Sequence, residues 1–117
     1  MDYNEACQNV QHHVGNSLAS LISLINQGEL TEINFQENVR VVICTLEKLL
    51  SEKLEGFPYQ PILEANLKSF RIGYERLRQV KYPNEVDESI KIMRSLTMII
   101  PSYEIMPNLQ TWDMRAE

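Results

Sequence analysis

Apolar residues recur every three or four positions along most of the chain, which is the spacing of one face of an α-helix. The first such face predicts a helix over residues 3–27. We expect this helix to open at Asp2, an N-cap with Glu5 three positions later, and to end at Gly28. Its apolar positions are Tyr3, Cys7, Val10, Val14, Leu18, Leu21, Ile22, Leu24 and Ile25.

The same spacing predicts three further helices, over residues 35–55, 61–81 and 85–100, with Asn34 and Asn84 as the N-caps of the second and fourth. Their principal apolar positions are Phe35, Val39, Val42, Leu46 and Leu49, then Leu63, Leu67, Phe70, Tyr74 and Leu77, then Val86, Ile90, Met93, Thr97 and Ile100, with Leu96 and Ile99 beside them. Short connections join antiparallel neighbours in helical bundles. We therefore expect an all-α fold, an antiparallel up-down-up-down four-helix bundle, as a single domain over residues 1–117.

The last segment, residues 101–117, is too apolar for a solvated tail. Its apolar residues are Tyr103, Ile105, Met106, Leu109, Trp112 and Met114. We expect this segment to pack across the end of the bundle. The alternative is a detachable segment that faces a partner protein.

The first predicted helix carries no Asp, Glu, Lys or Arg from residue 6 to residue 27. A surface helix normally turns a charged stripe to water. The face opposite its apolar side consists of small or uncharged polar residues, which permit close approach and hydrogen bonding. We expect a binding surface there, covered by the protein's own helices or by a second molecule; its residues are Gln8, His12, Asn16, Ala19 and Ser23. Tyr103, Met106, Leu109 and Trp112 are expected to form a second binding surface or a lid.

The formal charge of −5 argues against binding to nucleic acid or to an anionic membrane. No Lys or Arg precedes Arg40, so the net charge lies in the first third of the chain, while the basic residues of the third helix should form a solvated face. No apolar run is long enough to span a bilayer.

In the predicted hairpin, Cys7 and Cys44 would lie on the order of 15 Å apart. We expect both to be buried thiols in a cytoplasmic protein.

Most enzyme signatures are absent from the sequence. It contains no P-loop, GxGxxG, GxSxG, HExxH, ExxH or CxxC motif, and no Cys/His cluster at zinc spacing. His12 and His13 are adjacent, and neighbours on a helix point about 100° apart, so they are poorly placed to share a metal. We expect no cofactor and no metal site.

One local pattern remains, in which His12 is followed by Asn16 four positions on and by Leu18 six positions on. This stretch resembles the H-box of the dimerisation and phosphoacceptor helix of histidine kinases. The resemblance covers about seven residues and implies His12 as phosphoacceptor, with Asn16 beside it. The family usually has an acidic residue directly after the histidine, where this chain has His13.

The sequence therefore leads to three hypotheses about function. The preferred one is a non-enzymatic module that binds another protein, as an inhibitor, immunity factor, chaperone or adaptor. The alternative is a histidine phosphotransfer or histidine-kinase-like hairpin. A third class is a purely structural homodimer subunit, which would self-associate tightly and bind no other ligand.

Overall fold

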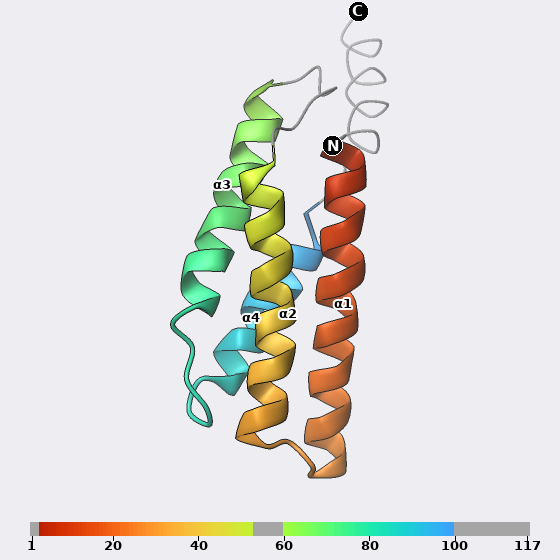
Figure 1. The fold of residues 1–117 in the computed structure, drawn as a ribbon, viewed down its shortest axis with the longest axis vertical. Helices are drawn as coiled ribbons and strands as arrows, with labels where there is room; N and C mark the ends of the chain where they lie inside the picture. The colour runs from red at the N-terminus through yellow and green to blue at the C-terminus, as the bar shows by residue number, and fades with distance from the viewer. Residues whose placement is uncertain (1–2, 53–59, 100–117) are drawn as a thin grey trace, which may run out of the picture.

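The fold consists of four α-helices, seen in a computed structural model that describes residues 3–52 and 60–99. They are α1 (Tyr3–Gln27), α2 (Glu32–Ser51), α3 (Gln60–Leu77) and α4 (Val86–Thr97) (Figure 1). No strand occurs within these two ranges. The predicted all-α class is confirmed.

The helices pack in a ring around a common core. α1 contacts α2 and α4, and α3 also contacts α2 and α4, so that α1 and α3 lie across the core from each other. Figure 1 shows successive helices running in opposite directions. None of the four has the length and the hydropathy that crossing a bilayer requires.

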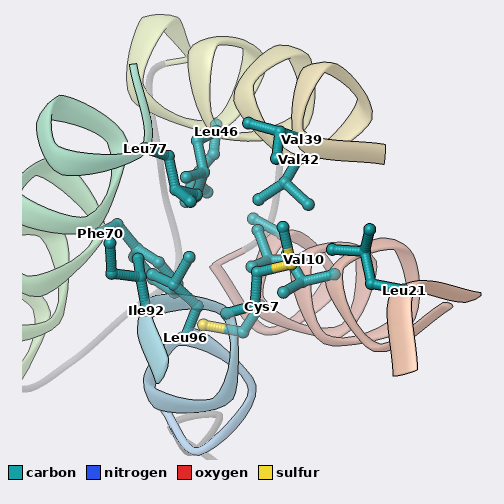
Figure 2. Close-up of a cluster of buried hydrophobic side chains, with 14 of the residues drawn as sticks. Cys7, Val10, Leu21, Val39, Val42, Leu46, Phe70, Leu77, Ile92 and Leu96 are labelled. Atoms are coloured by element: carbon teal, nitrogen blue, oxygen red, sulfur yellow. The ribbon is translucent and has the colours of Figure 1, made fainter. Parts of the chain in front are cut away.

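The core forms because each helix turns one apolar stripe inward, and burying large apolar side chains is the main favourable term in folding. Figure 2 shows side chains from all four helices meeting there. The largest fully buried side chains are Tyr3, Phe35, Phe70, Leu21, Leu46, Leu77 and Met93. The predicted inward stripes are confirmed at these positions.

Ser17 and Ala6 join the buried face of α1, with 5% and 2% of their surface exposed. Ser17 lies three residues after Val14 and four before Leu21, so it continues the alternation of three and four that marks the stripe. A serine there permits tight packing. Ile25, which was expected to widen the stripe, is 39% exposed.

The link between α1 and α2 is short and begins with two backbone hydrogen bonds. Gly28 has a φ of +68°, the left-handed conformation that glycine adopts without strain. The Gly28 amide donates to the Ile25 carbonyl at 3.1 Å and the Glu29 amide donates to the Leu24 carbonyl at 2.9 Å. These two bonds form a Schellman motif, which confirms the predicted end of the first helix.

The second helix begins earlier than predicted, because Thr31 rather than Asn34 is its N-cap. The Asn34 amide donates to Thr31 Oγ1 at 3.2 Å, and the Thr31 amide donates to Asn34 Oδ1 at 2.8 Å. Asn34 thus fills the third helical position of a capping box, where glutamate or glutamine is commoner. Tyr82, from the α3–α4 connection, donates from its hydroxyl to the Leu30 carbonyl at 3.3 Å and packs on Phe35, which closes this end of the molecule.

Three other predicted helix ends are also wrong by a few residues. α2 ends at Ser51, α3 at Leu77 and α4 at Thr97, short of the predicted 55, 81 and 100. The turn that follows α3 is tighter than an α-helical turn, since the Gln79 amide donates to the Arg76 carbonyl, three residues back, at 3.1 Å. The N-cap of α4 is Glu85 rather than Asn84, and its carboxylate accepts from the Lys81 amide at 3.0 Å instead of capping the helix. The predicted cap at Asp2 lies outside the described residues.

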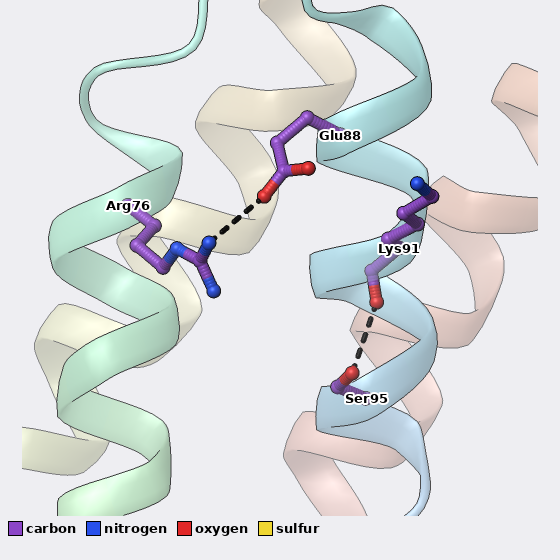
Figure 3. Close-up of polar contacts among 4 residues, drawn as sticks. All are labelled: Arg76, Glu88, Lys91 and Ser95. Atoms are coloured by element: carbon purple, nitrogen blue, oxygen red, sulfur yellow. Dashed lines mark hydrogen bonds and ion pairs between the residues drawn. The ribbon is translucent and has the colours of Figure 1, made fainter.

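α3 and α4 approach closely at Gly73. A Cβ added there would lie 2.8 Å from Cδ2 of Leu96, so the absence of a side chain permits this packing distance. Near the same interface, Arg76 and Glu88 form an ion pair at 3.1 Å across the surface (Figure 3). Both side chains are substantially exposed, so this pair contributes little to stability.

Candidate functional site

The predicted binding face of α1 is exposed along its whole length. Gln8, His12, Asn16, Ala19 and Ser23 are spaced by three or four residues and therefore lie on one side of the helix, and all five are exposed. The structure thus brings these five predicted residues together on a surface that faces away from the core. The other four candidates, Tyr103, Met106, Leu109 and Trp112, lie outside the described residues.

This face has no charged side chain between residues 6 and 27. At a rise of about 1.5 Å per residue, that stretch is roughly 33 Å long. Glu5, in the first turn, is the one charged residue of α1. When this face packs against another surface, no ionised side chain of α1 between residues 6 and 27 has to lose its water.

Side chains on the face already contact one another at two places. Nδ2 of Asn16 lies 3.4 Å from Nε2 of His12, one turn away, and Nε2 of Gln27 donates to Oγ of Ser23 at 3.3 Å. A Cβ added at Gly15, beside the face, would have no atom within 4 Å. A second helix can therefore approach the backbone of α1 closely at this point.

A groove that the sequence analysis missed adjoins the face near the end of α1. It has a volume of about 380 Å³ and lies between α1 and α4. Ile22 and Ile25 supply apolar surface, while Asp87, Lys91 and Arg94 of α4 supply charges of both signs. The two isoleucines had been assigned to the apolar side of the first helix, so their position in the sequence alone did not reveal an open groove.

Cys44 is exposed, and the prediction that both cysteines are buried is wrong for this residue. The inward positions of α2 are Val42 and Leu46, and residue 44 lies between them on the outer side. Cys44 lines a groove of about 250 Å³ between α1 and α2, together with His13 and Lys48. Both cysteines are free thiols, which agrees with the expectation that they do not pair.

A buried polar group lies where α1 begins. The Tyr3 hydroxyl accepts a hydrogen bond from the Asn66 side chain of α3, across the core. Burial raises the pKa of Tyr3, and its contact with Cys7 adds to this effect while the bond from Asn66 opposes it. Burial also raises the pKa of Cys7. Both groups are therefore held neutral in the fold.

These two groups predict a loss of stability in alkaline solution. Their ordinary pKa values are about 8.5 for cysteine and about 10 for tyrosine, so above pH 8.5 the unfolded chain releases protons that the folded chain keeps. The free energy of unfolding should then fall with pH, by at most about 1.4 kcal/mol per pH unit for each group. Urea unfolding at a series of pH values from about 7 to about 11 measures this slope.

Two variants show how much of the fall in the free energy of unfolding with pH comes from Cys7 and how much from Tyr3. Cys7→Ala should flatten the fall that begins near pH 8.5, and Tyr3→Phe should flatten the part above about pH 10. An unfolding midpoint that falls as steeply in both variants as in the original chain would contradict this account.

No group of three His, Cys, Asp or Glu side chains in the described part of the chain is arranged to hold a metal ion. The rings of His12 and His13 have centroids 5.3 Å apart at an angle of 71°.

The comparisons with known proteins find no match, whether among protein-family models, curated proteins or solved structures.

Proposed function

We propose that this protein is a non-enzymatic module that binds another protein through the exposed, uncharged face of α1. The observation that carries the proposal is that five uncharged residues of this face, from Gln8 to Ser23, are exposed. Charged residues are depleted at the centres of protein interfaces because they must lose water on binding. A long helical face without them is suited to such a contact.

The chemistry of the face favours a helix as the contacting element of the partner. Ala19 and Gly15 allow close approach, while Gln8, His12 and Asn16 offer hydrogen-bond donors and acceptors. The adjoining groove with Ile22 and Ile25 adds apolar surface, where a partner's apolar side chain could be buried. The partner is another protein or a second copy of this chain, and the proposal includes no nucleic acid, membrane, cofactor or metal.

Capture of partners from the native source tests this proposal. The tagged protein should retain one protein in near-stoichiometric amount, identified by mass spectrometry, or should form a dimer by light scattering of the purified chain. A monomer that retains nothing at high concentration would contradict the proposal.

A second candidate function is favoured by one contact. His12 is exposed, and the Asn16 amide lies 3.4 Å from its Nε2, which is the pairing that the resemblance to the histidine-kinase H-box implies. In this reading His12 accepts a phosphoryl group from a cognate kinase or response regulator and serves as a relay.

Incubation with phosphodonor kinases and response regulators tests the second candidate. We expect acid-labile phosphate on His12 that is lost in His12→Gln and retained in His13→Gln, since the neighbouring histidine is a matched control. Absence of phosphate with every cognate kinase would remove this candidate.

We also infer the arrangement of the complete chain. It is a single domain with up-down-up-down topology, with residues 101–117 packed on the bundle. The ring of helix contacts and the short α1–α2 link support this topology. The two free thiols support a reducing compartment, and we propose the cytoplasm.

A further inference from the structure

The sizes of the residues on the exposed face of α1 are arranged symmetrically about the middle of the helix. Gln8 and Ser23 are equally distant from the midpoint between residues 15 and 16, and so are His12 and Ala19. Each pair joins a large polar side chain to a small one, and all four residues are exposed. If two α1 helices pack antiparallel around a two-fold axis at this midpoint, each large side chain lies level with a small one of the other copy.

The midpoint leaves room for a second helix. α1 forms one edge of the molecule (Figure 1), and a Cβ added at Gly15 would meet no atom within 4 Å. Asn16, the next residue, is exposed. Packed helices have axes about 8–10 Å apart, with the distance set by the side chains at the contact. A two-fold axis between Gly15 and Asn16 therefore falls where the face of α1 permits close approach.

The distribution of charge also agrees with an antiparallel pair. After Glu5, α1 contains no Asp, Glu, Lys or Arg, so neither copy has to dehydrate an ionised side chain along the contact. Glu5 itself lies level with Asn26 of the other copy, at the edge of the contact. The groove that Asn26 lines has two cations, Lys91 and Arg94, against one anion, Asp87. Each end of the contact therefore brings together opposite net charges.

We propose that two copies of this chain pair antiparallel through the exposed face of α1, with the two-fold axis between Gly15 and Asn16. This inference rests on the proposed function, because it uses the same face and names the partner as a second copy. A strip about 33 Å long and about 10 Å wide offers roughly 330 Å² per copy. Stable interfaces bury roughly 800 Å² per partner, so this pair should be a reversible dimer that dissociates on dilution.

Sedimentation of the purified chain over a wide range of concentrations tests the pairing. We expect the average mass to rise with concentration from that of one chain toward that of two. Gly15→Arg should remain monomeric throughout, because it places a long charged side chain at the two-fold axis where the free protein has room for it. The matched control is Gln36→Arg, on an exposed position of α2, which should pair like the original chain. A chain that stays monomeric at millimolar concentration, or a dimer that Gly15→Arg does not dissociate, would overturn the proposal.

Disulfide trapping tests the antiparallel register. In a Cys44→Ser background the remaining native thiol, Cys7, is fully buried. Asn16→Cys should form a covalent dimer on mild oxidation, because the two copies of this residue meet beside the two-fold axis. Gln8→Cys should not link to itself, since its two copies lie about 22 Å apart and a disulfide requires Cα atoms within about 7 Å. A mixture of Gln8→Cys and Ser23→Cys chains should link one to the other.

Gln36→Cys, in the same background, measures linking by random collision. Self-linking of Gln8→Cys as fast as that of Asn16→Cys would indicate a parallel pair, and linking of Asn16→Cys no faster than that of Gln36→Cys would indicate another surface. Either result would overturn the proposal. A monomeric chain in which Ala19→Arg still abolishes capture of another protein would overturn the dimer and leave the proposed binding function standing.

Discussion

Replacing Phe70 by alanine is expected to lower the free energy of unfolding by about 3–5 kcal/mol, the usual cost of removing a buried phenylalanine side chain. Phe70 is 1% exposed and lies among side chains such as Ile92 and Leu96 of α4 (Figure 2). Removal of its ring takes away apolar burial and leaves a cavity between α3 and α4. Domains of this size have a free energy of unfolding of about 5–15 kcal/mol, so this loss is a large fraction of it.

Urea unfolding followed by circular dichroism measures this loss. The matched control is Ile33→Ala on α2, at a side chain that is 71% exposed, and it should change the free energy of unfolding by only about 0.5 kcal/mol. A Phe70→Ala protein as stable as this control would show that the ring does not pack in the core.

Replacing Ala19 by arginine is expected to abolish partner binding while leaving the fold intact. Ala19 is exposed at the middle of the uncharged face, so an arginine there has room in the free protein. In a complex the same side chain would block close approach and would have to lose its water. Hot spots, the few interface residues that cost about 2 kcal/mol or more when altered, cluster near the centre of an interface, and we expect affinity to fall by at least about 30-fold.

Partner capture, titration of the captured partner and thermal unfolding together measure this effect. Gln36→Arg, on an exposed position of α2, places the same charge away from the face and should bind normally. Unfolding of the protein by Ala19→Arg would contradict the exposure of Ala19 in the structure. Binding as tight as that of the original chain would show that the partner contacts another surface.

The helices and most of the core could be predicted because the apolar spacing directly reports which side of each helix is buried. Val10, Val14, Leu46 and Phe70 all follow from that spacing, and all are buried. Ser17 was missed because its side chain is polar, although its position in the alternation of three and four indicates burial. The exposure of Cys44 could have been found in the same way, since it lies between two inward positions of α2.

The ends of the helices were harder to predict, because several residues compete to cap each one. Thr31 and Asn34 are both good caps, and the choice between them depends on where the Schellman turn at Gly28 leaves the chain. Similarly, the Glu85 carboxylate accepts a hydrogen bond from the Lys81 amide within the α3–α4 connection, and no short sequence pattern predicts that contact.

The face of α1 was predictable as a set of residues because charge is absent from a long stretch of sequence. Its exposure was not predictable, since a helix without charges can equally be enclosed by its neighbours. The groove formed with Asp87, Lys91 and Arg94 depends on how α4 lies against α1, which the periodicity of one helix does not determine.

The α1–α2 turn gives the molecule one end that resists opening. The Schellman bonds and the reciprocal Thr31–Asn34 bonds hold the turn itself. The hydroxyl of Tyr82 ties it to the α3–α4 connection. Local opening begins where few contacts must break. We therefore expect slow amide exchange in the first turn of α2, near Phe35.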